Sequence, residues 1–545
     1  MLYRLACFCL LLLLSIESAT AITASSEKQL KKNLVAAKSN RTELEKAIAH
    51  FKDKGDTLEL DAVKFLIANM ADQGYIQLAL YDSSNKEIPF DIRDYKDFNQ
   101  AYEALKKVSM KYTGLSYRNK KEVKDLDSIS SEFLIQNVEL AFVAWRTLPW
   151  AKSLTYKQFQ EYVLPYRGTN EPLDNWRKTL FDKYRDFASQ LKDSTDPVEA
   201  AMRICTEELR NFVYDSLYYM QPTDQNYSDM EISKRGRCED QTNLMLFVAR
   251  ANALAVLSDY VPFWGNTGNN HNWNSVLNRF GKAVWLEDGR SLRQAYDLTG
   301  QAAKVFRKTF SRQSSSLAMQ LRPGDTAPPW LDDANHIDVS NEYMDVADVN
   351  LHLDGFKNLK THFAYLCVFN SGQWRPIDWT KITNGEAVFH NMGKQIAYCP
   401  ALCEDNKVEV FGGAFLLNRD GNIKILNGDN ARTTSVTLYA TTPKQTIQND
   451  SFIKEAANPS VISPDLFDTG FSYQLFYWDN DWKIIGTQVI QDPKKPLTFT
   501  QVPVQHLYWL VKSEAIRVTR SVFSQSKTEN RYFGKKPIFI LCFKK

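Results

Sequence analysis

The sequence has little of what would assign it at once to a class of binding protein. Its 67 basic and 64 acidic residues nearly balance, leaving a formal charge of +3. It contains no block of lysine and arginine and no basic stripe interleaved with aromatic residues, so we expect no nucleic-acid partner. With 44% hydrophobic and 24% charged residues, the composition is that of a globular chain and not of a disordered one.

Long apolar runs are also scarce. The longest is LACFCLLLLLSI at 5–16, which follows Arg4 and precedes the small residues ATA at 19–21. This run is too short to cross a bilayer, and no later segment offers ~18 uninterrupted apolar residues. The pattern is typical of a secretory signal peptide, and we expect cleavage after Ala21, with an uncleaved anchor as the alternative. We therefore expect an exported protein, periplasmic or secreted or at the cell surface, without a transmembrane anchor after cleavage.

Cysteine is sparse for an exported chain. Six cysteines would remain after cleavage, at 205, 238, 367, 399, 403 and 542, which is too few in this length for a disulfide framework. The spacing of Cys399 and Cys403 in CPALC suits a local bridge or half of a metal site. No second Cys/His pair follows at zinc-ligand spacing, and no acidic loop resembles a calcium site. We expect no metal and no other cofactor.

The chain has 545 residues, which are too many for one hydrophobic core. The spacing of its apolar residues changes along the sequence. From about 25 to 220, apolar residues recur at helical spacing, as Leu44, Ile48 and Phe51 do. After about 345, apolar and polar residues alternate, and Ser-Gly or Asp-Gly turns separate the runs. Such runs occupy 363–379, 413–428, 473–490 and 505–511. The pattern predicts an α+β protein with a helical N-terminal region and one or two C-terminal β-sandwich modules.

One segment, RGRCEDQTNLMLFVARA at 235–251, changes halfway from a charged turn into an apolar run. A helical pattern extends from Glu239 to about Leu257, so Cys238 should stand at the N-terminus of a helix. Unpaired backbone N–H groups and the helix dipole there favour a thiolate, and they could also hold an oxyanion. Gly236 allows the backbone to approach closely just before the thiol. A small buried hydrophobic residue or half of a disulfide is the alternative interpretation of Cys238.

A partner for the thiol follows in GNNHNWNSVL, where His271 stands in a predicted strand. The chain turns at Gly281 and returns as KAVWLEDG, so antiparallel pairing would bring Glu287 and Asp288 near His271. Neighbouring side chains of a strand point to opposite faces, so only one of the two acids can orient the imidazole. Cysteine, histidine and acid then form a nucleophile, a base and an orienting group. A structural histidine and a solvated turn acid are the alternatives.

These segments, GRCEDQTNLMLFVARANALAV, NHNWNSVL and KAVWLED, resemble the transglutaminase-like core, a branch of the papain-like cysteine fold. That family carries a G-x-C helix start, an H-x-W strand and a closing acid. The resemblance implies that Cys238 is the nucleophile and His271 the general base and acid. The family's closing strand often ends in Pro-aliphatic-Asp; here Glu287 takes the place of the Asp, with Asp288 as the alternative. The layout as a whole resembles exported transglutaminase-like proteins of Bacteroidetes-type bacteria.

The expected organisation combines these observations: a signal peptide at 1–21, a helical region at 22–165, a papain-like transglutaminase core at 166–345, and β-rich domains at 346–435 and 436–545. The resemblance implies cysteine-dependent acyl transfer through a thioester. We expect hydrolysis of an amide bond in a peptide, glycopeptide or cell-wall peptide, because an exported enzyme meets water more often than a positioned amine.

The alternative function is an inactive transglutaminase-like scaffold that carries carbohydrate- or protein-binding β modules. Its candidate sugar platforms are Trp374, Trp379, Trp478 and Trp482, although core packing is the favoured interpretation of these rings.

Further residues near the predicted site have a structural and a functional interpretation. Trp264 and Trp273 are candidates for flanking a substrate cleft, with packing in its wall or in the core favoured for each. Arg167, Glu171 and Arg177 are expected to fix helix ends and not to bind substrate.

Overall fold

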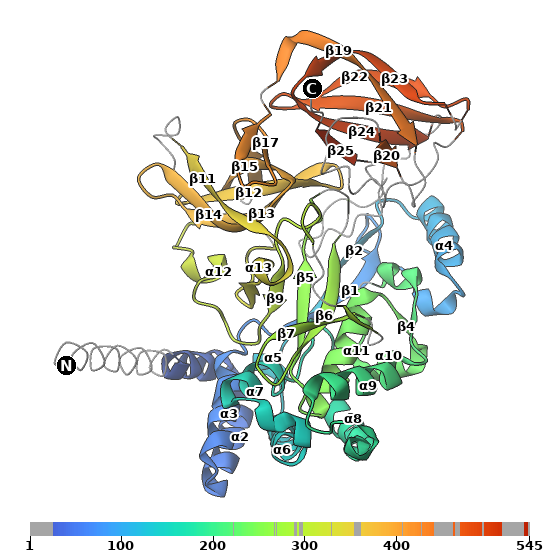
Figure 1. Cartoon of the computed structure of the whole chain (residues 1–545). Coiled ribbons are helices and arrows are strands. Elements are labelled where there is room, and N and C mark those ends of the chain that lie inside the picture. The colour runs from blue at the N-terminus through green and yellow to red at the C-terminus, as the bar shows by residue number, and fades with distance from the viewer. Residues whose placement is uncertain are drawn as a thin grey trace, which may run out of the picture. The chain divides into compact units, whose positions relative to one another are not determined.

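The computed structural model describes residues 26–542 except 222, 266–267, 269, 288–290, 294–297, 329, 354–360, 406, 427, 441–460, 464–468, 493–494 and 515–538. The predicted signal peptide at 1–21 lies outside the described residues. The fold is mixed α+β, with helices in the N-terminal part and strand-rich sheets in the C-terminal part, as predicted (Figure 1). In the part of the chain that the structure describes, no helix is both long and apolar enough to cross a membrane.

The chain divides into two compact units. The first contains residues 1–258, 272–294 and 309–312, and the second contains 259–271, 295–308 and 313–545. Strands β5 (Val256–Val261) and β6 (His271–Leu277) carry residues of both units. The domain boundaries predicted from the sequence stay predictions.

The first unit is mainly helical. Its helices are α2 (Arg41–Lys54), α3 (Thr57–Ala68), α4 (Phe98–Lys111), α5 (Asp125–Ser128), α6 (Ser131–Thr147), α7 (Tyr156–Tyr162), α8 (Trp176–Tyr184), α9 (Pro197–Leu209), α10 (Tyr227–Ser233) and α11 (Cys238–Ala251). Short 3-10 turns occupy Lys38–Asn40, Ile92–Asp94, Pro149–Ser153, Phe187–Gln190 and Ser216–Met220.

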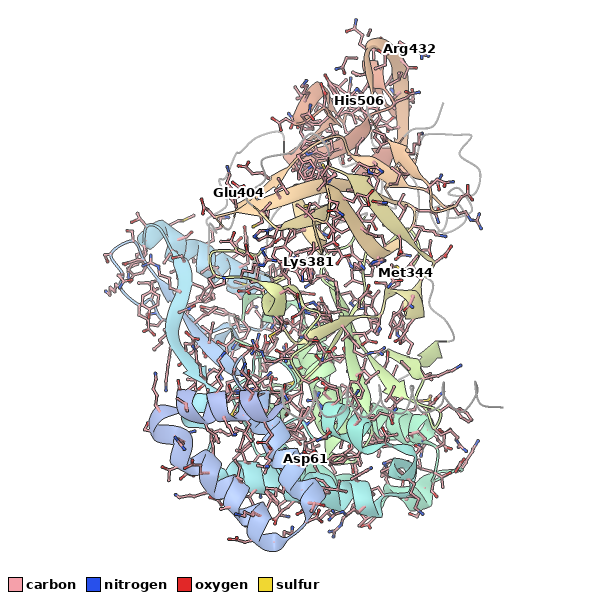
Figure 2. The ribbon with its side chains drawn as sticks, turned by 90° about the vertical axis from the view of Figure 1, so that its left-hand side faces the viewer. Asp61, Met344, Lys381, Glu404, Arg432 and His506 are labelled. Atoms are coloured by element: carbon pink, nitrogen blue, oxygen red, sulfur yellow. The ribbon has the colours of Figure 1, made fainter. Side chains whose placement is uncertain are left out.

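Local signals in the sequence set the ends of these helices. Helix α2 ends where Gly55 adopts φ +79°, a conformation that glycine tolerates best. Helix α3 then begins at the cap residue Asp56, whose carboxylate accepts hydrogen bonds from two backbone N–H groups of the first turn. Further along α3 lies Asp61 (Figure 2). Its carboxylate accepts hydrogen bonds from the Tyr156 hydroxyl and the Gln160 amide, at 3.0 and 2.8 Å. This contact ties α3 to α7.

A two-stranded antiparallel sheet interrupts the region predicted to be helical. Strand β1 (Gly74–Tyr81) pairs with β2 (Ser116–Lys124) over a connection that contains α4. Residues of β1 are partly buried, and Leu80 belongs to a small core that also contains Leu105 of α4. The sequence predicted a helical N-terminal region and did not indicate this sheet, whose strand β1 contributes to a core shared with α4.

Helix α11 is the central helix of the first unit. Its side chains from Thr242 to Ala251 are buried, which agrees with the long apolar run in the sequence. The helix ends at Ala251 and not near Leu257 as the periodicity predicted. Ala253 has a φ of +50°, which stops the helix, and the chain continues as strand β5. The apolar residues after Ala253 are buried as turn and strand residues.

The remaining strands of the first unit are short. Strands β3 (Val213–Tyr214) and β4 (Arg235–Gly236) form a small parallel pair, and β7 (Ala283–Glu287) lies between β6 and β8 (Ser291–Arg293) with antiparallel pairing to both. The hairpin of β6 and β7 around Gly281, which has a φ of +73°, confirms the turn predicted there.

The second unit consists mainly of antiparallel sheets. Strand β9 (Phe306–Lys308) pairs with β5 and with β10 (His336–Asp338), and two short helices follow, α12 (Leu317–Gln320) and α13 (Ser340–Tyr343). A two-stranded sheet joins β11 (Val346–His352) to β14 (Glu386–Gly393). A larger sheet has the order β13-β12-β15-β17-β18, with β16 also paired to β15. Its strands are β12 (Phe363–Asn370), β13 (Gln373–Lys381), β15 (Ile396–Glu404), β16 (Lys407–Val410), β17 (Phe415–Leu417) and β18 (Ile423–Ile425).

Two further sheets complete the second unit, in the orders β20-β19-β23 and β22-β21-β24-β25. Their strands are β19 (Asp429–Ala440), β20 (Val461–Ser463), β21 (Phe471–Trp478), β22 (Trp482–Val489), β23 (Leu497–Val504), β24 (Leu507–Glu514) and β25 (Phe539–Cys542). The predicted Ser-Gly hairpin between β12 and β13 is confirmed, since Ser371 and Gly372 both adopt positive φ, at 51° and 82°.

Candidate active site

Helix α11 begins at Cys238, as predicted, and strand β4 directly precedes it. Gly236 is needed at this point because an added Cβ would lie 2.5 Å from the Cβ of Asp240 and 2.8 Å from the ring of Phe212. Cys238 as a whole residue is partly buried. As a first-turn residue, it also has no intrahelical partner for its backbone N–H.

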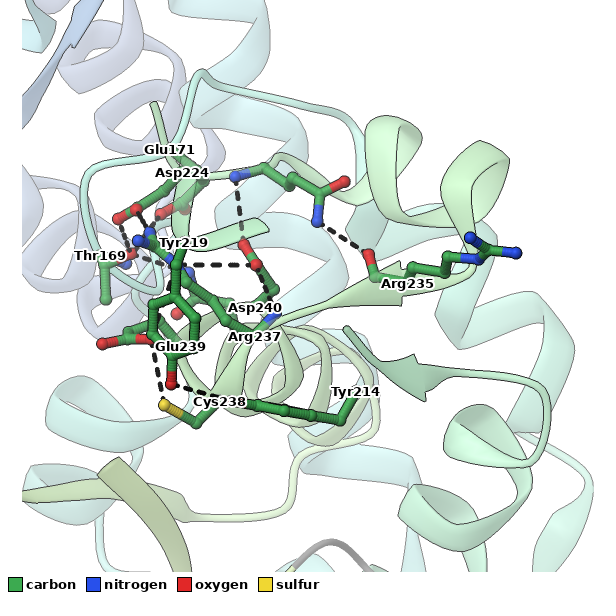
Figure 3. A network of polar contacts seen from close by, with 12 residues as sticks. Thr169, Glu171, Tyr214, Tyr219, Asp224, Arg235, Arg237, Cys238, Glu239 and Asp240 are labelled. Carbon is green, nitrogen blue, oxygen red and sulfur yellow. Dashed lines mark hydrogen bonds and ion pairs between the residues drawn. The ribbon is translucent and has the colours of Figure 1, made fainter. Parts of the chain in front are cut away.

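The thiol of Cys238 lies among polar side chains (Figure 3). It donates a hydrogen bond to Oε2 of Glu239 at 3.1 Å. The hydroxyl of Tyr219, a residue that acts to lower the pKa of this thiol, accepts a hydrogen bond from the Tyr214 hydroxyl at 3.0 Å. The sulfur is therefore hydrogen-bonded to one carboxylate, and Tyr219 acts on its charge.

The charge state of this thiol differs from the one expected from the sequence. Burial, together with the nearby carboxylate of Glu239, raises the pKa of Cys238 to about 12. Arg237 and Tyr219 act in the opposite direction but do not outweigh these effects. The prediction of a lowered pKa considered only the helix N-terminus and was wrong, because it omitted desolvation and the acid that follows the cysteine.

Arg237 organises the acids around the start of α11. Its side chain is 3% exposed and forms ion pairs with Asp224, with Glu239 at 3.5 Å and with Asp240 at 3.7 Å. Asp240 accepts a hydrogen bond from the Arg237 backbone N–H at 2.9 Å, and burial raises the pKa of its carboxyl to about 6. Asp224 accepts a further hydrogen bond from Thr169 at 3.0 Å. The acids near Cys238 are thus held in place by one buried cation.

His271 is the first residue of β6, the strand predicted for it. Its ring stacks on that of Trp264, with the centroids 6.2 Å apart and the planes 24° from parallel. Trp273, two residues along the strand, is 3% exposed and stacks on Trp285 at 4.6 Å. Trp273 therefore packs inside the protein, whereas Trp264 is a neighbour of the candidate base.

The candidate acid Glu287 is the last residue of β7. Register pairs Ser275 of β6 with Trp285 of β7, and Glu287 closes the strand opposite Ser291 of β8. The side chain of Glu287 and the whole of Asp288 lie outside the described residues.

The sequence did not indicate Tyr214, Tyr219 or Glu239 as site residues. The pairing of β3 with β4 joins the segment of Tyr219 to the start of α11, and it includes a hydrogen bond from the Asp215 N–H to the Gly236 carbonyl at 2.8 Å. A possible signal was the aromatic cluster in FVYDSLYY, an unusual composition so close to the cysteine in the chain.

Arg177 has the structural role predicted for it. It is 4% exposed and donates to the carbonyls of Val163, Leu164 and Pro165, at 2.9, 3.2 and 3.0 Å, and to that of Arg250 at 2.7 Å. These carbonyls lie at the C-terminal ends of α7 and α11. Burial lowers the pKa of its guanidinium well below the usual value.

The cysteines of the second unit are not arranged as CPALC suggested. Cys399 and Cys403 both lie within β15, where four residues span about 13 Å, too far for a disulfide. Cys399 is instead paired in register with Cys367 of β12, and all three are free thiols. Among the described residues, no three His, Cys, Asp or Glu side chains are grouped as metal ligands.

Three of the four tryptophans considered as sugar platforms, Trp374, Trp478 and Trp482, belong to one aromatic cluster. Trp478 contacts Trp374 and Trp482, with both centroid distances 5.3 Å, and Phe369 and Trp509 complete the cluster. The fourth, Trp379, packs edge-on against Phe363 at 5.5 Å. Rings that contact one another in this way act as core, which agrees with the favoured interpretation from the sequence.

Comparison with known families adds an independent observation. Residues 185–287 match the Transglutaminase-like superfamily, and no curated protein matches the chain. The matched segment runs from Arg185, directly after α8, through Cys238 and His271 to Glu287. The chain therefore contains a transglutaminase-like domain at 185–287. This superfamily generally includes cysteine-dependent enzymes, and some of its members are inactive.

Proposed function

We propose that the transglutaminase-like domain makes this chain a cysteine-dependent acyl-transfer enzyme with Cys238 as its nucleophile. The observation that carries the proposal is the position of Cys238, partly exposed at the first residue of α11, inside the segment that matches the superfamily. Unpaired N–H groups at a helix N-terminus suit the oxyanion that forms during acyl transfer.

The proposed reaction begins when His271 accepts the thiol proton and the sulfur attacks an amide carbonyl. A C–S bond forms, and the carbonyl π electrons move to the oxygen. The intermediate then expels the amine, which takes its proton from His271, and leaves a thioester on Cys238. Water attacks the thioester with His271 again as base, releasing the acid and the free thiol. The proposed substrates are peptides, glycopeptides or cell-wall peptides of an exported enzyme.

The proposed third member is Glu287. In the register that pairs Ser275 with Trp285, odd-numbered positions of β6 and β7 share a face of the sheet. Position 287 has this parity and position 288 does not. We therefore expect Glu287→Gln to lower turnover substantially while leaving Cys238 alkylatable, and Asp288→Asn to be milder. The reverse order would assign the role to Asp288.

The direct test compares the wild type with Cys238→Ala on mixed peptide, glycopeptide and peptidoglycan substrates. We expect new amide-cleavage products from the wild type and none from the variant. Cys205→Ala is the matched control, because Cys205 is buried in the helical core. Amide cleavage that survives in Cys238→Ala would contradict the proposal. For export, N-terminal sequencing of the protein from the extracytoplasmic fraction should begin at Ile22.

The second candidate is an inactive scaffold, and the observation that favours it is the raised pKa of the Cys238 thiol. A thiol that stays protonated and donates to Glu239 is a poor nucleophile without a base. The two candidates differ in acylation, since only the enzyme should form a covalent acyl adduct at Cys238 with an activated ester.

A further inference from the structure

A buried amine with two carboxyl partners lies in the second unit. The side chain of Lys304 is 2% exposed, and its Nζ donates to Oδ2 of Asp338 at 2.7 Å and lies 3.1 Å from Oδ2 of Asp378. The amine also donates to the carbonyl of His390 in β14. Asp338 ends β10 and Asp378 lies within β13, so one amine joins carboxyl groups that belong to two different sheets. All four residues lie outside the segment at 185–287 that matches the superfamily.

The backbone on both sides of Lys304 is fixed by hydrogen bonds. The Val305 carbonyl accepts from the Val339 N–H at 2.9 Å, and the Val305 N–H donates to Oγ of Ser340 at 2.9 Å. On the other side, the carbonyl of the preceding residue accepts from the Gly393 N–H of β14 at 3.0 Å. The amine is thus held beside the two carboxyl groups. Well-oriented groups of one molecule can react as if at effective concentrations of about 10⁵ M or more.

The two carboxyl groups have different surroundings. Burial and the charge of Asp338 raise the pKa of Asp378, whose side chain is 14% exposed, although Lys304 acts in the opposite direction. The protonated form, which an amine can attack with loss of water, is therefore favoured relative to an ordinary aspartate. Asp338 accepts hydrogen bonds at Oδ1 from the N–H and the hydroxyl of Ser340, at 2.9 and 2.5 Å, and its side chain is 26% exposed. As an acceptor that also reaches solvent, Asp338 can take up a proton and release it.

The amine itself rests as an ammonium ion. Burial alone would lower the pKa of Lys304, but the charges of Asp378 and Asp338 raise it. A proton must therefore move to a carboxylate before the nitrogen can attack. Burial of these charges is unfavourable, and condensation to a neutral amide removes the ammonium ion and one carboxyl group. The burial that penalises the ion cluster thus favours its conversion to an amide.

We propose that Lys304 and Asp378 condense to form an intramolecular isopeptide bond. Asp338 accepts one proton from the ammonium group, and Nζ attacks Cγ of the protonated Asp378. A C–N bond forms and a C–O bond breaks; the departing hydroxyl takes a second proton from the nitrogen and leaves as water. The first proton passes from Asp338 to solvent, so the step needs no oxidant and releases only water and one proton. The bond ties β13 to the chain just before β9, and it does not rest on the function proposed for Cys238.

The test is the mass of the denatured and reduced full-length protein, because denaturation separates an ion pair but not an amide. We expect the wild type to be lighter by one water than its sequence requires. A tryptic digest should contain a branched peptide that joins Lys304 to Asp378. Trypsin should also fail to cut after Lys304, since an acylated lysine carries no positive charge.

Four variants separate the roles of these groups. Lys304→Arg keeps a cation and Asp338→Asn keeps a hydrogen-bond acceptor, and neither should form the branched peptide. Asp378→Asn should still condense with loss of ammonia in place of water, so its branched peptide should have the same mass as that of the wild type. Lys394→Arg is the matched control and should keep the bond, because Lys394 forms an ion pair with Asp345 at 3.0 Å in the same unit. Circular dichroism and the melting temperature check that each variant is folded, and the digest of the wild type carries the test if one is not.

A wild type of full sequence mass that trypsin cuts normally after Lys304 would overturn the proposal and leave a buried ion cluster only. A branched peptide to Asp338 would overturn the roles assigned to the two acids. A loss of water without a branched peptide, persisting in Lys304→Arg, would indicate a succinimide at another aspartate and would also overturn it. Cys238→Ala should keep the bond, and its loss in that variant would overturn condensation by the cluster itself.

Discussion

Glu239 is the residue whose replacement most directly tests the charge balance at Cys238. Its carboxylate accepts a hydrogen bond from the thiol, with 3.1 Å between Sγ and Oε2, and its side chain is 19% exposed. A carboxylate so close to the sulfur penalises the thiolate, which would be a second negative charge in a partly desolvated site. Glu239→Gln keeps a hydrogen-bond acceptor of the same size and removes that charge.

The size of the effect follows from the geometry. Two unit charges about 4 Å apart interact by about 4 kcal/mol at an effective dielectric constant of 20, equivalent to about three pKa units. Arg237, whose Nε lies 3.5 Å from Glu239, offsets part of this repulsion, and solvent reaches the exposed part of the carboxylate. We therefore expect Glu239→Gln to lower the pKa of Cys238 by about one to two units. Below that pKa, alkylation should be about 10- to 100-fold faster.

The assay is the rate of iodoacetamide alkylation of Cys238 from pH 6 to 11, followed by mass spectrometry of the tryptic peptide. Glu231→Gln is the matched control, because Glu231 lies on α10 and pairs with Lys234 at 2.6 Å. Its profile should overlay that of the wild type. The reasoning would be refuted if the alkylation rate of the wild type had its pH midpoint at or below ~8.5 and Glu239→Gln did not shift that midpoint. Such a result would support a thiolate stabilised by the helix N-terminus.

Three further predictions concern stability and covalent structure. The pKa of Asp240 is raised to about 6 in the folded protein, from 3.8 for an ordinary aspartate. The stability that its protonated carboxyl contributes is therefore fully present below pH 3.8 and is lost as the pH rises through 6. The stability advantage of the wild type over Asp240→Asn should thus shrink between pH 4 and 7, by up to about 3 kcal/mol in urea titrations. Arg177→Met should destabilise the first unit by about 3 kcal/mol or more, measured by thermal melting, because it leaves buried carbonyls without a hydrogen-bond donor. Unchanged stability would show that these carbonyls find other donors. Non-reducing peptide mapping should find no bridge between Cys399 and Cys403, whereas such a bridge would contradict their place in one strand.

Features of the site that depend on neighbouring residues in the sequence could be predicted. The helix start at Cys238 follows from a charged, glycine-containing turn that passes directly into an apolar run. The hairpin that carries His271 follows from two alternating segments around Gly281. In each case the backbone signal and the side-chain pattern lie within one short window, so local physics is enough.

Features that depend on distant parts of the chain could not be predicted in the same way. The segment of Tyr219 is joined to the start of α11 by the pairing of β3 with β4, a pairing of two residues on each side that leaves no periodic signal. The β1–β2 sheet was missed for a related reason, since Leu80 of β1 is buried in a core that also contains Leu105 of α4, which is distant in the sequence. Cys399 and Cys403 appeared close in the sequence, but an extended strand separates what a helix or turn would bring together.

The raised pKa of Cys238 has a consequence for how such a site reacts. The helix N-terminus and the Tyr219 hydroxyl both favour the anion, yet burial and Glu239 together outweigh them. A thiol in this balance is not a standing thiolate paired with an imidazolium, as in sites where the anion predominates at rest. In the proposed reaction it would lose its proton as the substrate arrives. The proposed enzyme would therefore depend on proton transfer to His271 during the attack more than a preformed ion pair does.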